Sequence, residues 1–293
     1  MELSRYVFSS LREGDFNLYR GSGNGLTPIL FVTAENASLG SFKRLEHEYA
    51  LKAELDAAWA ARPVVLFHYN DRMTLVLDDP GGEVPDRLLG QPLDTLDFLR
   101  IAIQLANALG RVHQQGLIHK DIKPANILVD AVSGKVRLTG FGIATRAPRE
   151  RQVPAPPESI AGTPAYMAPQ QTGRMNRSID SRSDLYALGM TFYQVLTGSL
   201  PFTVTDPMEL IHGHIARDAV APHERTPAVP AQLSTIVMKL LAVQFAADKK
   251  ARPADIRATP GSSHSNRVAR GSFAHALPSR RDYYGQSGLA EAS

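Results

Sequence analysis

The sequence predicts an α+β protein of two lobes, a small strand-rich lobe followed by a large α-helical lobe. Three observations support this prediction. Short apolar runs bounded by Gly, Pro, Asn and Asp occupy much of residues 1–77, as expected for strands. Apolar residues recur at helical spacing in several segments after residue 93. Between these two parts, residues 78–82 read DDPGG, a turn-forming composition that suits a connector between the lobes.

The small lobe is expected to span about residues 5–78 and to contain strands and one helix. The strands are predicted from the apolar runs at residues 17–19, 29–32, 64–68 and 74–77. The helix is predicted over residues 41–55, between the second and third of these strands.

The large lobe is expected to span about residues 83–245 and to begin with an amphipathic helix. The apolar face of this helix comprises Phe98, Ile101, Leu105, Ala108, Leu109 and Val112. Asp94 can cap its start and Gly116 can end it.

A hairpin and further helices are expected to complete the large lobe. Two short strands, residues 127–129 and 136–138, should pair through a turn at Ser133 and Gly134. The remaining helices are predicted over residues 183–197, 207–216 and 232–242.

The composition restricts the kind of protein this can be. There are no cysteines, which excludes disulfide bridges and thiolate metal sites and fits a reducing compartment. The start of the chain shows no basic segment followed by an apolar core, and no apolar run approaches the ~18 residues of a membrane span. We therefore expect a cytoplasmic protein without a membrane span.

Positive charge is concentrated near the end of the chain. Residues 249–293 contain eight Lys or Arg and three Asp or Glu, an excess of five; subtracting it from the net charge of +3 leaves −2 for residues 1–248. The folded part is therefore not expected to bind nucleic acid. Residues 249–293 are rich in Ser, Gly, Arg and Ala without apolar periodicity, and we expect them to form a disordered basic tail.

The most specific motif lies between a predicted helix and a predicted strand, at residues 118–129, which read IHKDIKPANILV. It resembles the catalytic loop of protein kinases, with Lys120 where Arg is commonest. The resemblance implies that Asp121 accepts the proton of the attacking hydroxyl, that Lys123 offsets charge on the transferred phosphoryl group, and that Asn126 holds Mg²⁺. Taken singly, each residue would also suit a polar turn; the joint spacing favours the catalytic loop.

Two further segments resemble protein kinases in the expected order. Residues 161–169 (AGTPAYMAP) resemble the end of an activation segment, in which Thr163 marks the serine/threonine branch. Residues 183–189 (SDLYALG) are similar to the helix start whose Asp fixes the catalytic-loop backbone. The resemblance implies a two-lobed protein-kinase-like fold over about residues 5–245, with ATP and Mg²⁺ as cofactors.

Nucleotide-binding residues follow from the same resemblance. Residues 11–17 (LREGDFN) occupy the place of the glycine-rich loop but keep one glycine, Gly14, where three would let backbone N–H groups approach the phosphates. Asp78 and Asp79 begin the connector, where adenine contacts are expected. Together with Asn126, these residues are the predicted cofactor-binding set.

Two groups that kinases use on the phosphates are missing. Residues 138–142 read LTGFG and put Gly140 where a metal-binding Asp is expected. The third-strand lysine should fall near Phe31 or Val32, where no basic residue occurs.

Two nearby charges bear on the missing lysine. Glu48 stands where the partner of that lysine would be, and it suits either a functional role or a solvated helix face. Arg20 is the nearest candidate to replace the lysine.

Three functions stay open at this point. The resemblance implies a serine/threonine kinase acting on a protein substrate, with Asp121 and Lys123 catalytic. Losing one charge-stabilising group costs on the order of 10²–10³ in rate, so we expect weak or no transfer, which Gly140→Asp alone restores only in part. The alternatives are a pseudokinase that binds a regulatory protein partner and, less favoured, a small-molecule phosphotransferase.

A narrower resemblance is visible in two segments. Residues 171–180 (QTGRMNRSID) and 236–241 (IVMKLL) resemble the kinase-like module at the amino end of large bacterial sensor proteins. In those proteins an ATPase region and a histidine-kinase region follow the module. The resemblance implies a role in bacterial signalling.

Overall fold

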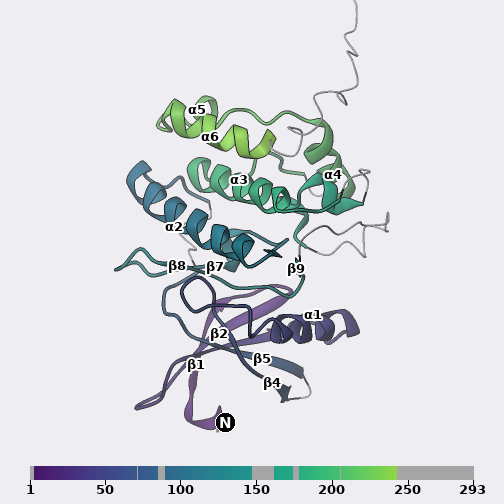
Figure 1. Cartoon of the computed structure of the whole chain (residues 1–293). Coiled ribbons are helices and arrows are strands. Elements are labelled where there is room, and N and C mark those ends of the chain that lie inside the picture. Colours follow the sequence, from purple (N-terminus) through teal and green to yellow (C-terminus); the bar gives the residue numbers. More distant parts are fainter. Residues whose placement is uncertain are drawn as a thin grey trace, which may run out of the picture. The chain divides into compact units, whose positions relative to one another are not determined.

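The computed structural model describes residues 3–70, 72–84, 90–146, 162–173, 178–204 and 206–242. The chain divides into two compact units, residues 1–250 and 251–293, and every described residue belongs to the first. Figure 1 shows the strands of the small lobe and the helices of the large lobe within this unit. The predicted tail, residues 249–293, lies outside the described residues.

The small lobe is a five-stranded antiparallel sheet with one helix against it (Figure 1). Its strand order is β1-β2-β3-β5-β4. The elements are η1 (Leu3–Arg5), β1 (Val7–Arg12), β2 (Phe16–Ser22), β3 (Ile29–Ala34), α1 (Leu39–Ala50), β4 (Pro63–Tyr69) and β5 (Arg72–Asp78). The four predicted strands are therefore confirmed. The sequence pattern missed β1, whose central Ser-Ser pair interrupts any apolar run.

The two faces of the sheet bury different side chains, because successive residues of a strand point to opposite sides. In β3, Leu30 and Val32 pack in one apolar cluster with Leu45 of α1. Phe31, between them, packs in a second cluster on the other face, with Val76 of β5. All six residues of β3 are buried, so this strand is the centre of the lobe.

The helix α1 begins and ends earlier than predicted. The Oγ of Ser38 accepts a hydrogen bond from the backbone N–H of Ser41 at 3.0 Å and caps the helix, so that it starts at Leu39. It ends at Ala50, and residues 51–54 form turns. Leu51 and Leu55, which extend the helical spacing in the sequence, are buried in the large apolar cluster of the molecule.

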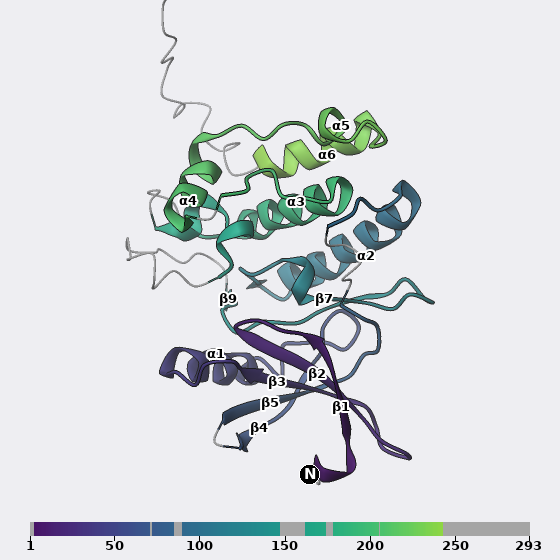
Figure 2. The same cartoon turned by 180° about the vertical axis from the view of Figure 1, so that it is seen from behind.

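The large lobe is mostly helical and is seen from the opposite side in Figure 2. Its elements are α2 (Thr95–Gln114), β6 (Leu117–Ile118), η3 (Pro124–Asn126), β7 (Ile127–Val129), β8 (Val136–Leu138), β9 (Thr145–Arg146), η5 (Pro164–Tyr166), η6 (Pro169–Thr172), α3 (Arg182–Thr197), α4 (Pro207–Ala216), α5 (Pro222–Arg225) and α6 (Ala231–Ala242). The predicted hairpin is the antiparallel pair β7 and β8. The two-lobed α+β fold predicted from the sequence is thus confirmed.

Helix α2 is amphipathic in the way its sequence predicts. The Asp94 carboxylate accepts from the N–H groups of Leu96 and Asp97, which satisfies two donors at the helix start. Phe98, Leu105 and other members of its predicted apolar face are buried in the core of the large lobe. Gly116 follows the helix with φ +72°, a left-handed conformation that glycine adopts without strain.

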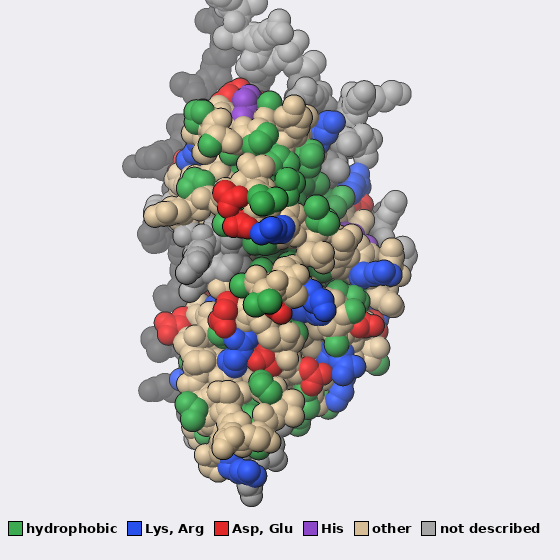
Figure 3. Space-filling view, turned by 90° about the vertical axis from the view of Figure 1, so that its left-hand side faces the viewer, with side chains coloured by type: hydrophobic (Ala, Val, Ile, Leu, Met, Phe, Trp, Pro, Cys, Tyr) green, Lys and Arg blue, Asp and Glu red, His purple; other side chains and the backbone are tan. Residues whose placement is uncertain are grey.

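The surface in Figure 3 carries mixed charge. Over the small lobe, Lys and Arg side chains lie among Asp and Glu side chains, and hydrophobic side chains gather over the large lobe. On this face the described residues therefore present no continuous basic area. In the described part of the chain, no helix has both the length and the apolar character needed to cross a lipid bilayer.

A buried histidine in the large lobe predicts acid sensitivity. His214 is 3% exposed, its Nδ1 lies 2.7 Å from the hydroxyl of Tyr186, and its ring packs against Tyr186 and Phe202. Burial lowers the pKa of His214 to about 4. The unfolded chain, with an ordinary histidine pKa, therefore binds a proton before the folded chain does. Stability is full above about pH 6.5 and is lost as pH falls toward about 4.

Lowering the pH from about 7 to about 5 should reduce the free energy of unfolding by about 2 kcal/mol through His214. Urea unfolding of the wild type and of His214→Gln at both pH values measures the difference, and the variant should lose most of it. His212→Gln, an exposed histidine on the same helix, is the matched control. Equal pH dependence in wild type and His214→Gln would contradict the assignment.

Candidate functional site

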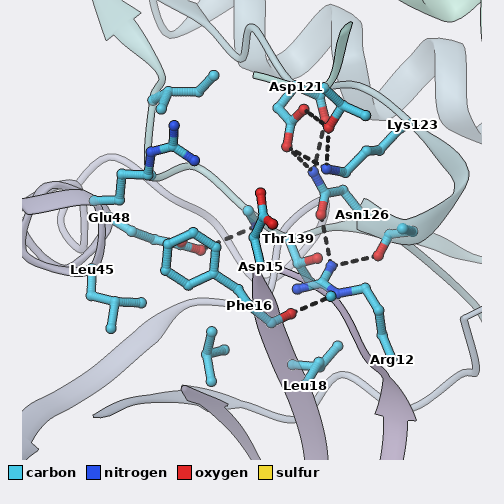
Figure 4. Close-up of a pocket in the computed structure, with 18 of the residues that line it drawn as sticks. Arg12, Asp15, Phe16, Leu18, Leu45, Glu48, Asp121, Lys123, Asn126 and Thr139 are labelled. Carbon is cyan, nitrogen blue, oxygen red and sulfur yellow. Dashed lines mark hydrogen bonds and ion pairs between the residues drawn. The ribbon is translucent and has the colours of Figure 1, made fainter. Parts of the chain in front are cut away.

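A cavity of about 270 Å³ lies where the start of the small lobe meets the hairpin of the large lobe. Figure 4 shows side chains from both lobes pointing toward it. Its charged and polar side chains are Arg12, Glu13, Asp15, Arg44, Glu48, Asp121, Lys123, Asn126, Thr139 and Thr163. Gly14 and Gly140 also line it. Of the predicted site residues, Gly14, Asp121, Lys123 and Asn126 are therefore brought together here.

The backbone of the catalytic loop is held by a buried carboxylate. Asp184, at the start of α3, is fully buried and accepts from the N–H groups of His119 and Lys120, both at 2.8 Å. Its Oδ2 also lies 2.9 Å from Nε2 of His113 on α2. Lys120 has φ +69°, a left-handed conformation that costs a non-glycine residue energy and persists where surrounding contacts fix it.

His119 fixes the same loop from its other side. Burial lowers the pKa of this histidine, which favours the neutral ring. Nε2 lies 3.1 Å from the carbonyl oxygen of Thr139, which can only accept, so Nε2 carries the proton. Nδ1 is then the acceptor for the N–H of Asp121 at 3.2 Å. The ring also packs on Phe141, with centroids 4.5 Å apart, so the loop is tied to residues 139–141.

Three side chains converge on Asp121 (Figure 4). The hydroxyl of Thr163 donates to Oδ1 at 2.8 Å, and the Lys123 ammonium lies 2.9 Å from Oδ2. Nδ2 of Asn126 donates to Oδ2 and to the main-chain oxygen of Asp121, both at 2.8 Å. Lys123 also donates to the Thr163 hydroxyl. A carboxylate, an ammonium and a hydroxyl thus share one hydrogen-bonded cluster in the lining of the cavity.

Glu48 is buried rather than solvated. It is 4% exposed and its carboxylate accepts from the N–H of Gly140 at 3.2 Å. Burial raises the pKa of this carboxyl, partly offset by backbone hydrogen bonds from Phe141 and Gly140. Val32, which lines the cavity, occupies the face of β3 from which a lysine would reach Glu48. The sequence left a solvated helix-face acid open as an alternative, and that alternative is wrong.

Gly140 is held in a conformation and a space that suit glycine. Its φ is +81°, and a Cβ atom added there would lie 2.8 Å from three side-chain atoms of Asn126. Any larger residue at this position would have to displace Asn126. A carboxylate at position 140 is therefore incompatible with the present position of the Asn126 side chain.

Arg12, at the end of β1, reaches across the cavity to the large lobe (Figure 4). Its Nη1 donates to Oδ1 of Asn126 at 2.7 Å and to the main-chain oxygen of Ala125 at 2.5 Å. Its Nε donates to the carbonyl oxygen of Phe16 at 3.3 Å. Sequence reasoning missed this residue, because the isolated Arg12 sits in a segment read only for its glycines.

Arg20, the predicted replacement for the lysine, lies elsewhere. It forms ion pairs with Asp79 and Glu83, both at 2.6 Å, and donates to the carbonyl oxygen of Gly82. It does not line the cavity. The cation that the structure brings to the cavity from the small lobe near Asn126 is Arg12, so the expectation for Arg20 is wrong.

The connector acids do not line the cavity either. Asp78 pairs with Arg62 at 3.1 Å, and the carboxylate of Asp79 is engaged by Arg20. A role for Asp78 and Asp79 in nucleotide binding stays a prediction.

The residues around Asn126 do not fit a Mg²⁺ site. Mg²⁺ prefers a near-octahedral set of oxygen ligands. Here Oδ1 of Asn126 accepts from Arg12, and Gly140 supplies no side chain. The described ranges contain no group of three or more His, Asp or Glu that could hold a metal ion. A guanidinium bound to the would-be ligand oxygen also repels a divalent cation.

Apart from the metal, the site combines the carboxylate of Asp121 and the ammonium of Lys123, both on one loop, with the hydroxyl of Thr163 from a later segment. Phosphoryl-transfer enzymes use groups of these kinds. The family model described as the protein kinase domain matches residues 31–262. The chain therefore belongs to the protein kinase domain family.

The chain is similar to several bacterial serine/threonine-protein kinases. The chain is 32% identical over 182 residues to serine/threonine-protein kinase PknB of Mycobacterium tuberculosis, covering 61% of this chain and 27% of that one. It is 32% identical over 253 residues to serine/threonine-protein kinase Pkn1 of Myxococcus xanthus, covering 79% and 36%. It is 36% identical over 145 residues to DNA damage-responsive serine/threonine-protein kinase RqkA of Deinococcus radiodurans, covering 50% and 21%. The chain thus spans about a fifth to a third of the length of these relatives.

Proposed function

We propose that this chain is a serine/threonine protein kinase domain with low phosphoryl-transfer output. The observation that supports it best is the cluster in which the Asp121 carboxylate meets the Thr163 hydroxyl and the Lys123 ammonium. The Thr163 hydroxyl donates to Asp121, as the hydroxyl of a substrate Ser or Thr would. In this role Asp121 accepts the proton of the attacking hydroxyl, and Lys123 offsets charge on the phosphoryl group.

Output is expected to be low because two charges are absent. Val32 stands where a lysine would neutralise phosphate, and Gly140 stands where a carboxylate would bind metal. Catalysis of phosphoryl transfer relies on positioning and electrostatic stabilisation, so each loss is expected to cost on the order of 10²–10³ in rate.

Replacing Asp121 with alanine tests the proposal. We expect a slow wild-type transfer of labelled phosphate from ATP to a generic protein substrate, and a fall of roughly 10²-fold or more in Asp121→Ala, because the general base is lost. Asp218→Ala, which removes an exposed acid of the same lobe, should leave the rate unchanged. Equal background counts in wild type and Asp121→Ala would refute transfer by this chain.

The second candidate is a pseudokinase that binds a regulatory protein partner. The contact between Arg12 and Asn126 favours it, because that contact engages the oxygen a kinase would use on metal. In this case the Asp121 cluster would serve to order the activation segment.

The biological setting is also proposed by resemblance. Segments 171–180 and 236–241 resemble the kinase-like module of large bacterial sensor proteins, which favours a cytoplasmic signalling role. The side chain of Gln171, in the first segment, donates to the main-chain oxygen of Lys120 at 2.8 Å. This residue therefore helps to hold the catalytic loop.

A further inference from the structure

The side chain of Arg12 is turned into the cavity by an irregularity in its strand. In β1, Ser10 pairs with Tyr19 but Arg12 pairs with Leu18, so Leu11 is an extra residue in the ladder. A bulge of this kind re-aims the side chains that follow it. Arg12 consequently reaches Ala125 and Asn126, which lie 113 and 114 positions further along the chain.

The amide of Asn126 is oriented to receive a cation. Nδ2 faces two oxygen atoms of Asp121, which can only accept, so Oδ1 must be the atom that faces Arg12. Asp121 and Arg12 thus fix the amide from opposite sides. The place beside Oδ1 is filled by a guanidinium nitrogen.

Arg12 keeps a donor for a ligand. Nη1 and Nε are used on Asn126, Ala125 and Phe16, whereas Nη2 makes no hydrogen bond with the described residues. Burial lowers the pKa of Arg12, opposed by the charges of Glu48 and Asp121, but an arginine stays protonated. A fixed, partly desolvated guanidinium with an unused N–H is a binding group for phosphate.

The acids of the cavity leave room for an anion. Glu13 and Asp15 are exposed to solvent, which screens them, and the carboxylate of Glu48 accepts from the N–H of Gly140. The carboxylate of Asp121 is already matched by Lys123 and two hydrogen-bond donors. Arg44, which lies over the Phe16 ring at 6.0 Å, adds a further cation to the lining.

We propose that Arg12 is the phosphate-binding cation of this cavity, and that a nucleoside triphosphate binds here through Arg12 and without Mg²⁺. The ligand class rests on the proposed function, since it takes a nucleoside triphosphate as the natural occupant. Arg12 would supply the positive charge that the absent third-strand lysine and the absent metal would otherwise provide, and it would hold this charge beside Asn126. The nucleoside triphosphate then binds without an accompanying Mg²⁺ ion.

Calorimetric titration of the full chain with ATP, in Mg²⁺ and in a chelator, tests the proposal. We expect wild-type Kd values that agree within about twofold in the two buffers. Arg12→Gln should weaken ATP binding about tenfold or more and leave adenosine binding unchanged, because only the phosphate contact is lost. Arg12→Lys should lose less than Arg12→Gln, since it keeps the charge but not the planar fork.

The matched control is Arg72→Gln. Arg72 lies on β5 of the same lobe, donates to the carbonyl oxygen of Ala34 and does not line the cavity, so ATP affinity should not change. ATP affinity that rises about tenfold or more with Mg²⁺, or that Arg12→Gln does not alter, overturns the proposal. So does a wild-type chain that binds no ATP, or an Arg12→Gln chain that loses adenosine together with ATP and melts at a lower temperature.

The transfer assay separates this proposal from the proposed function. Arg12-dependent, Mg²⁺-independent ATP binding without transfer would uphold the inference and refute the kinase activity. Transfer that depends on Asp121 and Mg²⁺ but not on Arg12 would uphold the activity and overturn the inference.

Discussion

Asp184→Ala is expected to lower the free energy of unfolding by about 3–5 kcal/mol. The substitution leaves the buried N–H groups of His119 and Lys120 without their acceptor, and each such donor costs about 1–3 kcal/mol. It also releases the left-handed Lys120, whose conformation these bonds maintain. For a unit of this size the melting temperature should fall by roughly 10 °C.

Thermal and urea unfolding measure this loss. Asp97→Ala removes an exposed acid that pairs with Arg100 on α2, and it should cost no more than about 0.5 kcal/mol. Asp184→Asn keeps the shape and one acceptor oxygen, so its cost should lie between the two. A change below about 1 kcal/mol in Asp184→Ala would show that the loop is held by other contacts.

The second large effect is expected when both missing charges are rebuilt. Val32→Lys with Gly140→Asp should raise phosphate transfer on the order of 10²-fold above wild type, because a lysine at 32 would share the cavity with Glu48 and supply the missing positive charge for the phosphates. We expect this lysine, rather than the carboxylate at 140, to account for the gain. Transfer of labelled phosphate is the measurement. Adding Asp121→Ala to the double variant should remove the gain.

Gly140→Asp alone is now expected to give no rescue, in contrast to the partial rescue predicted from the sequence. Its Cβ would meet Asn126 at 2.8 Å, and its carboxylate would be placed near Arg12, which can neutralise it. The strained φ of +81° adds a stability cost. A single Gly140→Asp variant that transfers as fast as the double variant would contradict this account.

The fold could be predicted well because its signals are local. The apolar runs of β2 to β5, the spacing in α2 and the capping residue Asp94 all act within a few residues of where they stand. The proximity of Asp121, Lys123 and Asn126 could be predicted because the three residues lie within one short loop, where spacing along the chain fixes spacing in the structure.

The rest of the site depends on contacts that the sequence does not reveal. Arg12 meets Asn126 across 114 positions and only because a bulge turns it inward, and a bulge leaves no apolar pattern to detect. Arg20 looked nearer to the missing lysine along the sheet, but Asp79 and Glu83 attract it to the connector. Proximity in sequence to a missing charge was therefore a poor guide to its replacement.

The ion pairs of Arg20 give the connector two contacts of different sensitivity to dissolved salt. The Asp79 side chain is 3% exposed, whereas the Glu83 side chain is 69% exposed. Mobile ions screen exposed charges over about 8 Å at physiological ionic strength but act far less on buried ones. Rising salt would thus weaken the exposed ion pair between Arg20 and Glu83 first. The buried ion pair between Arg20 on β2 and Asp79 would persist, so β2 stays bound to the connector over a wide range of cellular ionic conditions.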